Sequence, residues 1–299
     1  MRSVACSVVI PTRDRPGPLD TCLGALAAQS LPRDRFEVIV VDDGSRTAVE
    51  PRLVAWRARL NLEHARTPGA GPSAARNAGA AVAAGRYLAF TDDDCVPEPG
   101  WLQALLAGFE ARPDALIGGR TLNLLGGSPA PETSQLISDV VQDFYNADQG
   151  HPRFFSSNNL AVEAASLRAV GGFDERFTTA EDRDLCDRWL ASGRPMTFVP
   201  DAVVGHAHRM SVGGFIRQHV GYGRGAYLFK RARQSRSPEA SSVELGFYAG
   251  LLPRIVRLMR GRRNPAALAA LLVVWQMANT AGYVQAWAAA RAPRPRGTA

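Results

Sequence analysis

The segment Arg86-Tyr87-Leu88-Ala89-Phe90-Thr91-Asp92-Asp93-Asp94 is the most informative stretch of this chain. Its first part is an apolar run typical of a buried strand, and its last part is three adjacent carboxylates. Such carboxylates repel one another and are costly to bury, so a fold that places them at a strand end usually supplies a cation. In an extended backbone Asp92 and Asp94 would point to the same side and offer two oxygen ligands to Mg²⁺ or Mn²⁺. The alternative is an acidic loop that caps the next helix.

The first half of the chain alternates strand-like runs with helical patterns. Strands are predicted at residues 5–10, 36–41 and 86–90, and helices near residues 18–30, 47–59, 72–84 and 100–111. This alternation indicates crossover connections and a mostly parallel sheet flanked by helices, which is an α/β fold. Ser73 is the predicted N-cap of the third helix, and Trp101 is predicted to pack in the core.

Polar residues follow each of the three predicted strands. The first is followed by Pro11-Thr12-Arg13, the second by Asp42-Asp43-Gly44-Ser45 and the third by the aspartate triplet. Because ligands of doubly wound sheets bind beyond the carboxyl ends of the strands, these residues are expected to share one crevice. The Gly-x-Gly-x-x-Gly pattern of dinucleotide-binding folds does not follow the first strand, and the P-loop pattern is missing, which argues against a dehydrogenase and a P-loop protein.

The remaining chemistry fits a nucleoside diphosphate. Asp42 and Asp43 can accept hydrogen bonds from a ribose hydroxyl or a base N–H. A cation at the aspartate triplet, helped by Arg13 and Arg76, can neutralise a diphosphate. A lone arginine more often forms a structural ion pair, and that alternative stays open for Arg76.

Six segments carry a family resemblance through their order along the chain. They are Ser7-Val8-Val9-Ile10-Pro11-Thr12-Arg13, Val38-Ile39-Val40-Val41-Asp42-Asp43-Gly44-Ser45, Ala75-Arg76-Asn77-Ala78-Gly79, Phe90-Thr91-Asp92-Asp93-Asp94, Gly171-Gly172-Phe173-Asp174-Glu175 and Glu181-Asp182. Over residues 4–210 the chain thus resembles family 2 glycosyltransferases, whose GT-A fold is a Rossmann-like, mostly parallel mixed sheet. The Gln-x-x-Arg-Trp motif of processive synthases does not follow Glu181-Asp182, which favours a single-addition enzyme.

The resemblance implies an inverting, metal-assisted transfer of a sugar from a nucleoside diphosphate sugar to an acceptor hydroxyl. The implied acceptor is a lipid-linked sugar, a polysaccharide or another glycan, as in cell envelope polysaccharide biosynthesis, and the implied cofactor is Mg²⁺ or Mn²⁺. The implied donor-binding residues are Pro11, Thr12, Arg13, Asp42, Asp43, Arg76, Asn77, Asp92 and Asp93; the metal ligands are Asp92, Asp94 and His206; the acceptor-side residues are Asn158, Asn159 and Glu181; and the general base is Asp182.

A general base at Asp182 agrees with the chemistry, because an attacking hydroxyl must lose its proton while the metal stabilises the departing diphosphate. Plainer alternatives remain. Carboxylates such as Glu181 and Asp182 are common at helix starts, asparagines such as Asn158 are common in turns, and paired histidines such as His206 and His208 often lie at ordinary surfaces. For the whole protein, the alternatives are a nucleotidyltransferase and a non-catalytic nucleotide-binding relative.

Charge is distributed unevenly along the chain. Of its 299 residues, 209–299 carry 15 basic and 2 acidic side chains, a net charge of +13, which leaves −6 on residues 1–208. Residues 215–236 and 251–259 combine arginines with apolar residues, as helices at a lipid interface do, and residues 266–290 carry no charge. This pattern favours an anionic membrane surface over nucleic acid as the partner of the tail.

The sequence therefore predicts two regions. Residues 1–210 are expected to form a GT-A nucleotide-sugar-binding catalytic domain, and residues 211–299 a basic, helical extension that associates with a membrane or mediates a homodimer. The four cysteines are scattered through apolar segments without a Cys-x-x-Cys pair, which favours free thiols in a reducing compartment. The expected location is the cytoplasm, peripherally at the inner face of the cell membrane.

Overall fold

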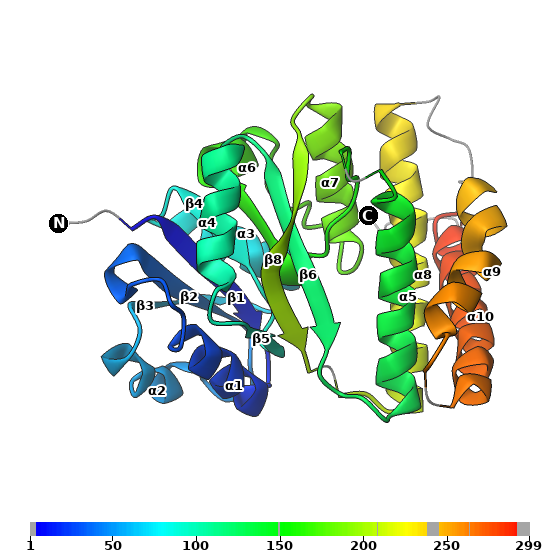
Figure 1. Cartoon of the computed structure of the whole chain (residues 1–299), viewed down its shortest axis with the longest axis horizontal. Helices are drawn as coiled ribbons and strands as arrows, with labels where there is room; N and C mark the ends of the chain where they lie inside the picture. Colours follow the sequence, from blue (N-terminus) through cyan, green and yellow to red (C-terminus); the bar gives the residue numbers. More distant parts are fainter. Residues whose placement is uncertain (1–3, 149, 208, 238–244, 263, 292–299) are drawn as a thin grey trace, which may run out of the picture.

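The computed structural model describes residues 4–148, 150–207, 209–237, 245–262 and 264–291, and His208 of the predicted histidine pair lies outside them. The centre of the protein is an eight-stranded mixed sheet in the order β3-β2-β1-β4-β7-β6-β8-β5 (Figure 1). The strands are β1 (Cys6–Thr12), β2 (Phe36–Asp43), β3 (Leu62–Thr67), β4 (Tyr87–Phe90), β5 (Cys95–Pro97), β6 (Leu116–Asn123), β7 (Leu160–Glu163) and β8 (Met196–His206).

Helices cover both faces of the sheet and form a wall beyond one end of it (Figure 1). They are α1 (Pro16–Leu26), α2 (Glu50–Leu53), α3 (Pro72–Val82), α4 (Trp101–Ala111), α5 (Pro129–Tyr145), α6 (Ala164–Ala169), α7 (Glu181–Ala191), α8 (Val212–Arg236), α9 (Leu245–Met259) and α10 (Pro265–Ala289). Three single-turn 3₁₀ segments lie at Arg33–Arg35, Trp56–Ala58 and Ser157–Asn159.

Strand β1 is the centre of the parallel half of the sheet. It pairs in parallel with β2 on one side and β4 on the other, so that Cys6 lies opposite both Phe36 and Tyr87. This shared register brings the carboxyl ends of the three strands to one edge. Beyond β4 the sheet becomes mixed, because β7 is antiparallel to both β4 and β6. The predicted α/β fold with a mostly parallel mixed sheet is confirmed.

The apolar runs of the strands are explained by burial on both faces of the sheet. Every residue of β2 is buried. Val38 and Val40 pack into the core on the α1 and α4 side, whereas Ile39 and Val41 pack into the core on the α3 and α7 side. Strands covered on both faces read as continuous apolar runs, which is why this half of the sheet is visible in the sequence.

Some predicted local features are wrong. The N-cap of α3 is Gly71, with φ of 98°, and the Ser73 hydroxyl instead donates a hydrogen bond to the Phe177 carbonyl at 2.7 Å. The predicted helix at residues 47–59 is reduced to α2 and a 3₁₀ turn. Trp101, in contrast, is fully buried as predicted.

The last three helices pack against α5, which is contributed by the middle of the chain. Phe215 of α8 and Trp275 of α10 share an apolar cluster with Leu136 and Ile137 of α5. The main chains of α8 and α10 come into contact at two glycines: a Cβ added to Gly223 would lie 2.0 Å from the Asn279 carbonyl oxygen, and one added to Gly282 would lie 2.0 Å from the Val220 carbonyl oxygen. The predicted helical character of the C-terminal region is confirmed, and it forms one wall with α5.

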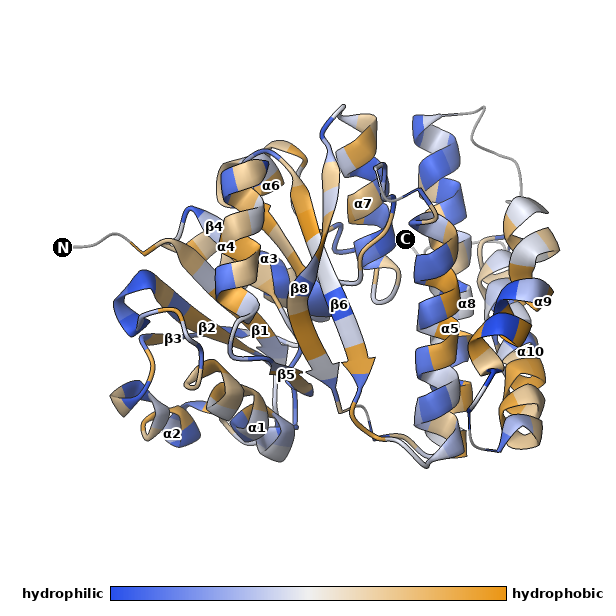
Figure 2. Cartoon of the chain, viewed as in Figure 1, coloured by the Kyte–Doolittle hydropathy of each residue, from blue (hydrophilic) through white to orange (hydrophobic). Residues whose placement is uncertain are grey.

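Helix α10 is the one helix within the described residues that has the length and hydropathy of a membrane span, with a mean hydropathy of 1.4 over its most apolar window. Buried core helices of soluble proteins can have the same properties, so this is weak evidence for a span. Much of its ribbon has apolar colouring (Figure 2), and Val273, Met277 and Trp287 are exposed.

Candidate active site

A large cavity lies between the edge of the sheet and the helical wall. Its volume is about 1250 Å³, and it is lined by residues of the sheet edge and by residues of α5, α8, α9 and α10. Most of the predicted site residues meet in this lining: Pro11, Thr12, Arg13, Asp43, Arg76, Asp92, Asp93, Asp94, Asn158, Glu181, Asp182 and His206. Three predicted residues are outside the lining, namely Asp42, Asn77 and Asn159.

The aspartate triplet forms a turn between β4 and β5, and the extended geometry predicted for it is wrong. The Cys95 N–H donates to the Asp92 carbonyl oxygen at 3.1 Å, which closes the turn. As a result, Asp93 and Asp94 lie on the same side and share one partner, since the Arg15 guanidinium lies 2.9 Å from Asp93 and 2.5 Å from Asp94. The sequence alternation of side chains therefore did not apply here, because it holds only along a strand.

Burial sets the protonation of the middle carboxylate. Asp93 is 2% exposed, and this burial raises its pKa to about 7, although Arg15 and a hydrogen bond from the Thr12 hydroxyl both favour the charged form. The Thr12 bond is 2.7 Å long and ties the end of β1 to the turn. The carboxyl ends of β1 and β4 are thus joined by side-chain contacts at the cavity floor.

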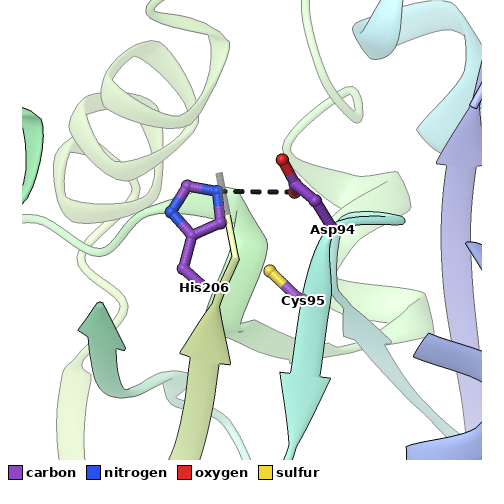
Figure 3. A group of neighbouring side chains, drawn as sticks. All are labelled: Asp94, Cys95 and His206. Atoms are coloured by element: carbon purple, nitrogen blue, oxygen red, sulfur yellow. Dashed lines mark ion pairs between the residues drawn. The ribbon is translucent and has the colours of Figure 1, made fainter. Parts of the chain in front are cut away.

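His206 ends β8 beside the turn (Figure 3). Its Nε2 lies 3.4 Å from an Asp94 carboxylate oxygen, and the potential ligand atoms of Asp94, Cys95 and His206 all lie within 4.8 Å of one another. Burial disfavours the charged imidazole, but the hydrogen bond and the negative charge of Asp94 outweigh it and raise the pKa of His206. Burial also raises the pKa of the Cys95 thiol well above its ordinary value, so this thiol stays protonated.

These residues fit a hard divalent cation. Carboxylate oxygens of the turn with one imidazole are the donors that Mg²⁺ and Mn²⁺ accept, whereas a protonated thiol is a poor ligand. The carboxylates are already matched with arginines, since Asp92 pairs with Arg76 at 2.7 Å and the other two pair with Arg15. A cation bound here would have to share carboxylates with these guanidinium groups.

Arg76 is a buried cation that joins two acidic segments. Its guanidinium lies 2.7 Å from Asp92 and 2.9 Å from Glu181, and the side chain is 3% exposed. Burial opposes its charge, but the neighbouring carboxylates outweigh that cost and raise the pKa of Arg76. Arg76 therefore makes the structural ion pairs that were the alternative to donor binding, while it also lines the cavity.

Asp182 lies in the first turn of α7, on the cavity side. Ala180 precedes this helix with φ of 67° and provides no side-chain cap. Burial, with the Glu181 carboxylate beside it, raises the pKa of Asp182 to about 7. The Ser156 hydroxyl lies 3.4 Å from one carboxylate oxygen. A half-buried carboxylate that titrates near neutral pH and lines a cavity has the properties that a general base requires.

The end of β2 delivers one aspartate to the cavity and uses the other to shape the chain. Asp43 lines the cavity and accepts hydrogen bonds from the Thr67 hydroxyl at 2.6 Å and the Gly71 N–H at 3.0 Å. Asp42 is fully buried and accepts the Ser45 N–H at 2.8 Å. The turn after β2 therefore depends on Asp42, and Asp43 is the residue of the pair that faces the cavity.

The asparagines outside the cavity lining have clear structural roles. The Asn77 side chain bonds to both the N–H and the carbonyl of Phe173, which holds the 171–175 loop. The Asn159 amide donates to the Arg120 and Ala202 carbonyls and accepts from the Trp101 indole. These contacts use the side chains fully, so the donor-side role predicted for Asn77 and the acceptor-side role predicted for Asn159 have no support from this geometry.

Sequence reasoning missed two groups of cavity residues. The first is Arg15, which lies two residues beyond the phosphate-binding candidate Arg13. The second is the wall formed by α8 and α10, which includes Gln218, His219 and Trp275. A signal for the wall was present in the sequence, because polar and aromatic residues interrupt helices that are otherwise apolar or basic.

A family model described as glycosyl transferase family 2 matches residues 7–166. A pre-mycofactocin glycosyltransferase from Mycobacterium tuberculosis is 32% identical over 222 residues, which are 73% of this chain and 46% of the relative. A validoxylamine A glucosyltransferase from Streptomyces hygroscopicus subsp. jinggangensis is 32% identical over 221 residues, which are 64% of this chain and 52% of the relative. The chain thus spans about half the length of these curated relatives.

Solved structures show the same fold. The mannosyltransferase PcManGT from Pyrobaculum calidifontis, in complex with GDP-Man and Mn²⁺, superposes with a TM-score of 0.66 at 18% identity over 97% of this chain and 87% of that one. Residues 1–349 of TarS from S. aureus, in complex with UDP-GlcNAc, give a TM-score of 0.56 at 18% identity over 96% of this chain and 92% of that one. At such identities the likeness shows the fold alone.

The Arg76 ion pairs lead to a stability prediction. Arg76→Met should lower the free energy of unfolding by about 3–5 kcal/mol, because it leaves two carboxylates without their buried cation. The matched control is Arg86→Met, which removes the Arg86–Glu163 pair at an arginine whose side chain is 63% exposed, and it should cost at most about 1 kcal/mol. Urea denaturation of both variants measures the difference, and equal losses would contradict the role given to Arg76.

Proposed function

Because the chain belongs to glycosyl transferase family 2, we propose that it transfers a glycosyl group from a nucleoside diphosphate sugar to an acceptor hydroxyl. The observation that carries this proposal is that the aspartate turn, Asp43 and Asp182 line one cavity. Donor binding, leaving-group stabilisation and proton removal each need a group in the same space, and these residues are suited to those three tasks. In this proposal residues 1–210 carry the donor site, and residues 211–299 close the cavity.

The donor side is proposed to be the floor of the cavity. Asp43 receives a ribose hydroxyl or a base N–H, and the exposed Arg13, together with Arg15, attracts the diphosphate. Asp92, Asp94 and His206 would hold Mg²⁺ or Mn²⁺, which supplies the positive charge that stabilises the leaving diphosphate. PcManGT with GDP-Man and Mn²⁺ is a structural neighbour that supports this cofactor class.

Asp182 is proposed as the general base. It takes the proton of the acceptor hydroxyl as that oxygen attacks the anomeric carbon and the bond to the diphosphate breaks. One displacement of this kind inverts the anomeric centre. A nucleotide-binding protein without activity would not need a half-buried carboxylate with a raised pKa at this position, so we favour catalysis over binding alone.

The C-terminal helices are proposed to place the protein at the inner face of the cell membrane. Leu252 and Val256 on α9 and Met277 on α10 are exposed apolar residues. Arg254 and Arg257, which pair with Asp143 of α5, lie close to the first two along α9. Apolar residues mixed with arginines suit a surface of anionic lipids. The alternative is that these helices contact a second copy of the chain. Co-sedimentation with anionic vesicles would support membrane binding, and a dimer in analytical ultracentrifugation would support the alternative.

Substitution of the proposed base tests the function. Asp182→Asn should lower the rate of glycosyl transfer by about 10²–10⁴-fold, because an amide cannot accept the hydroxyl proton. The measurement is release of nucleoside diphosphate from UDP- or GDP-sugars with a panel of acceptors. Asp187→Asn is a matched control in the same helix, since Asp187 pairs with Arg233 and Arg236 and does not line the cavity. Wild-type rates in Asp182→Asn would exclude this residue as the base.

The pKa of Asp182 predicts the pH dependence. Because burial raises this pKa to about 7, the carboxyl is protonated and inactive below it and ionised above it. The transfer rate should therefore rise between about pH 6 and pH 8 and reach a plateau. The residual rate of Asp182→Asn should lack this rise. An identical profile in wild type and variant would show that another group controls the reaction.

A third prediction concerns the cation. UDP or GDP should raise the melting temperature more with Mn²⁺ present than without it, because a ligand that binds the native state stabilises it. His206→Gln should raise the Mn²⁺ concentration needed for half of this effect by about 10-fold or more. His151→Gln, at an exposed histidine far from the turn in sequence, is the control. If the stabilisation of the wild type by nucleotide is the same with and without Mn²⁺, the proposed role of the metal is wrong.

A further inference from the structure

Two adjacent residues of α8, Gln218 and His219, bring unusual polar atoms to the helical wall of the cavity. The Gln218 Oε1, the His219 Nδ1 and the His219 Nε2 are buried and have no hydrogen-bond partner among the described residues. His219 is only 1% exposed. Buried polar atoms are nearly always paired, and three unpaired atoms on two neighbouring residues that line one cavity require an explanation.

Aromatic rings surround these atoms. The His219 ring is in edge contact with Phe215, Tyr222 and Trp275, at centroid distances of 4.3, 5.3 and 6.5 Å. Gln218 donates from Nε2 to the Tyr222 hydroxyl at 2.6 Å, which holds its Oε1 in place. Burial lowers the pKa of His219 to about 4, so the ring is neutral and offers one donor and one acceptor.

Packing alone does not account for a histidine here. A phenylalanine has nearly the same shape and would fill this position without the cost of two unsatisfied nitrogens. A metal site does not account for it either, because the one cluster of potential ligands in the described part of the chain is Asp94, Cys95 and His206. Unpaired hydrogen-bonding atoms held in a rigid aromatic frame are typical of a site prepared for a polar ligand.

We propose that Gln218 and His219, framed by Tyr222 and Trp275, form the acceptor subsite, and that it takes an uncharged ring with several hydroxyl groups, such as a sugar or a cyclitol. This inference rests on the proposed glycosyl transfer. A hydroxyl both donates and accepts, so it can satisfy the Gln218 oxygen and either nitrogen of His219. The apolar C–H face of such a ring can pack on the aromatic side chains.

Other acceptor chemistries fit this wall less well. An alkyl chain would leave the three polar atoms unpaired. A phosphate would favour cations, but the cationic residues of α8 that line the cavity are Lys230 and Arg233. They lie 12 and 15 residues beyond Gln218, and so about 18 and 22 Å away along the helix. The binding atoms near Gln218 and His219 are uncharged.

The test uses the full chain and three probes: methyl β-D-glucopyranoside, myo-inositol and decyl phosphate. His219→Phe removes both nitrogens and keeps the ring shape. The matched control is His64→Phe, because His64 also has a buried nitrogen without a partner but lies outside the cavity lining. Binding is followed by saturation-transfer NMR of the probes and by titration, and folding is followed by the melting temperature.

The expected result is that wild type and His64→Phe bind at least one of the two hydroxylated rings, and that His219→Phe binds it at least about 10-fold more weakly. The melting temperature of His219→Phe should be equal to or higher than that of wild type, because an unsatisfied buried group has been removed. A purely structural histidine would give a lower melting temperature and unchanged binding.

Three results would overturn the subsite: equal binding by His219→Phe, no binding of either hydroxylated ring to wild type, or a preference for decyl phosphate. Release of nucleoside diphosphate from UDP- and GDP-sugars by the wild type, measured with and without the hydroxylated rings, separates this inference from the proposed function. Ring binding that depends on His219 in a protein that releases no nucleoside diphosphate under either condition would support ring binding at this wall and contradict the proposed transfer from these donors. Donor hydrolysis with ring binding that is independent of His219 would refute the subsite alone.

Discussion

The arrangement of this protein depends on the neutralisation of buried carboxylates by two arginines. Arg15 holds Asp93 and Asp94, and Arg76 holds Asp92 and Glu181. Through these pairs the start of α1 and the body of α3 are tied to the turn after β4, and the turn is tied to the start of α7. Carboxylates placed this close together would otherwise repel one another and favour protonation. The four acidic groups outnumber the two guanidinium groups, and this excess of carboxylates at the cavity floor can attract a divalent cation.

The parallel half of the sheet could be predicted from the sequence because its strands are buried on both faces. Residues 38–41 form a continuous apolar run that is followed by two aspartates, and this local pattern predicts both the buried strand and the polar residues at its carboxyl end. Boundaries were less accurate where a tertiary contact decides them. Ser73 could have capped α3, but the Phe177 carbonyl offers its hydroxyl a partner that lies far away in the sequence.

The candidate site was predictable in its sheet-derived part and, through the family resemblance, at Arg76 of α3 and at Glu181 and Asp182 of α7. Aspartates that follow parallel strands gather at one edge, so Asp43 and the turn at residues 92–94 could be expected there, whereas His206 was expected from the family resemblance. The polar and aromatic residues that interrupt α8 and α10 were a signal for a lining surface, but the place of these helices at the cavity depends on packing against α5, which no local pattern encodes. Asn159 illustrates the opposite error, in which a predicted site residue has a structural role instead. Its side-chain amide forms hydrogen bonds with β6, β8 and the Trp101 indole and so holds them together.

The close approach of the α8 and α10 main chains, at Gly223 against Asn279 and at Gly282 against Val220, has a mechanical consequence. Because no side chain separates the two main chains at this point, α8 and α10 have no clearance in which to slide or roll against each other. If a lipid layer or another protein displaces α10, α8 should therefore move together with it. Adsorption at the exposed side of α10 would therefore shift the residues of α8 and α10 that line the cavity.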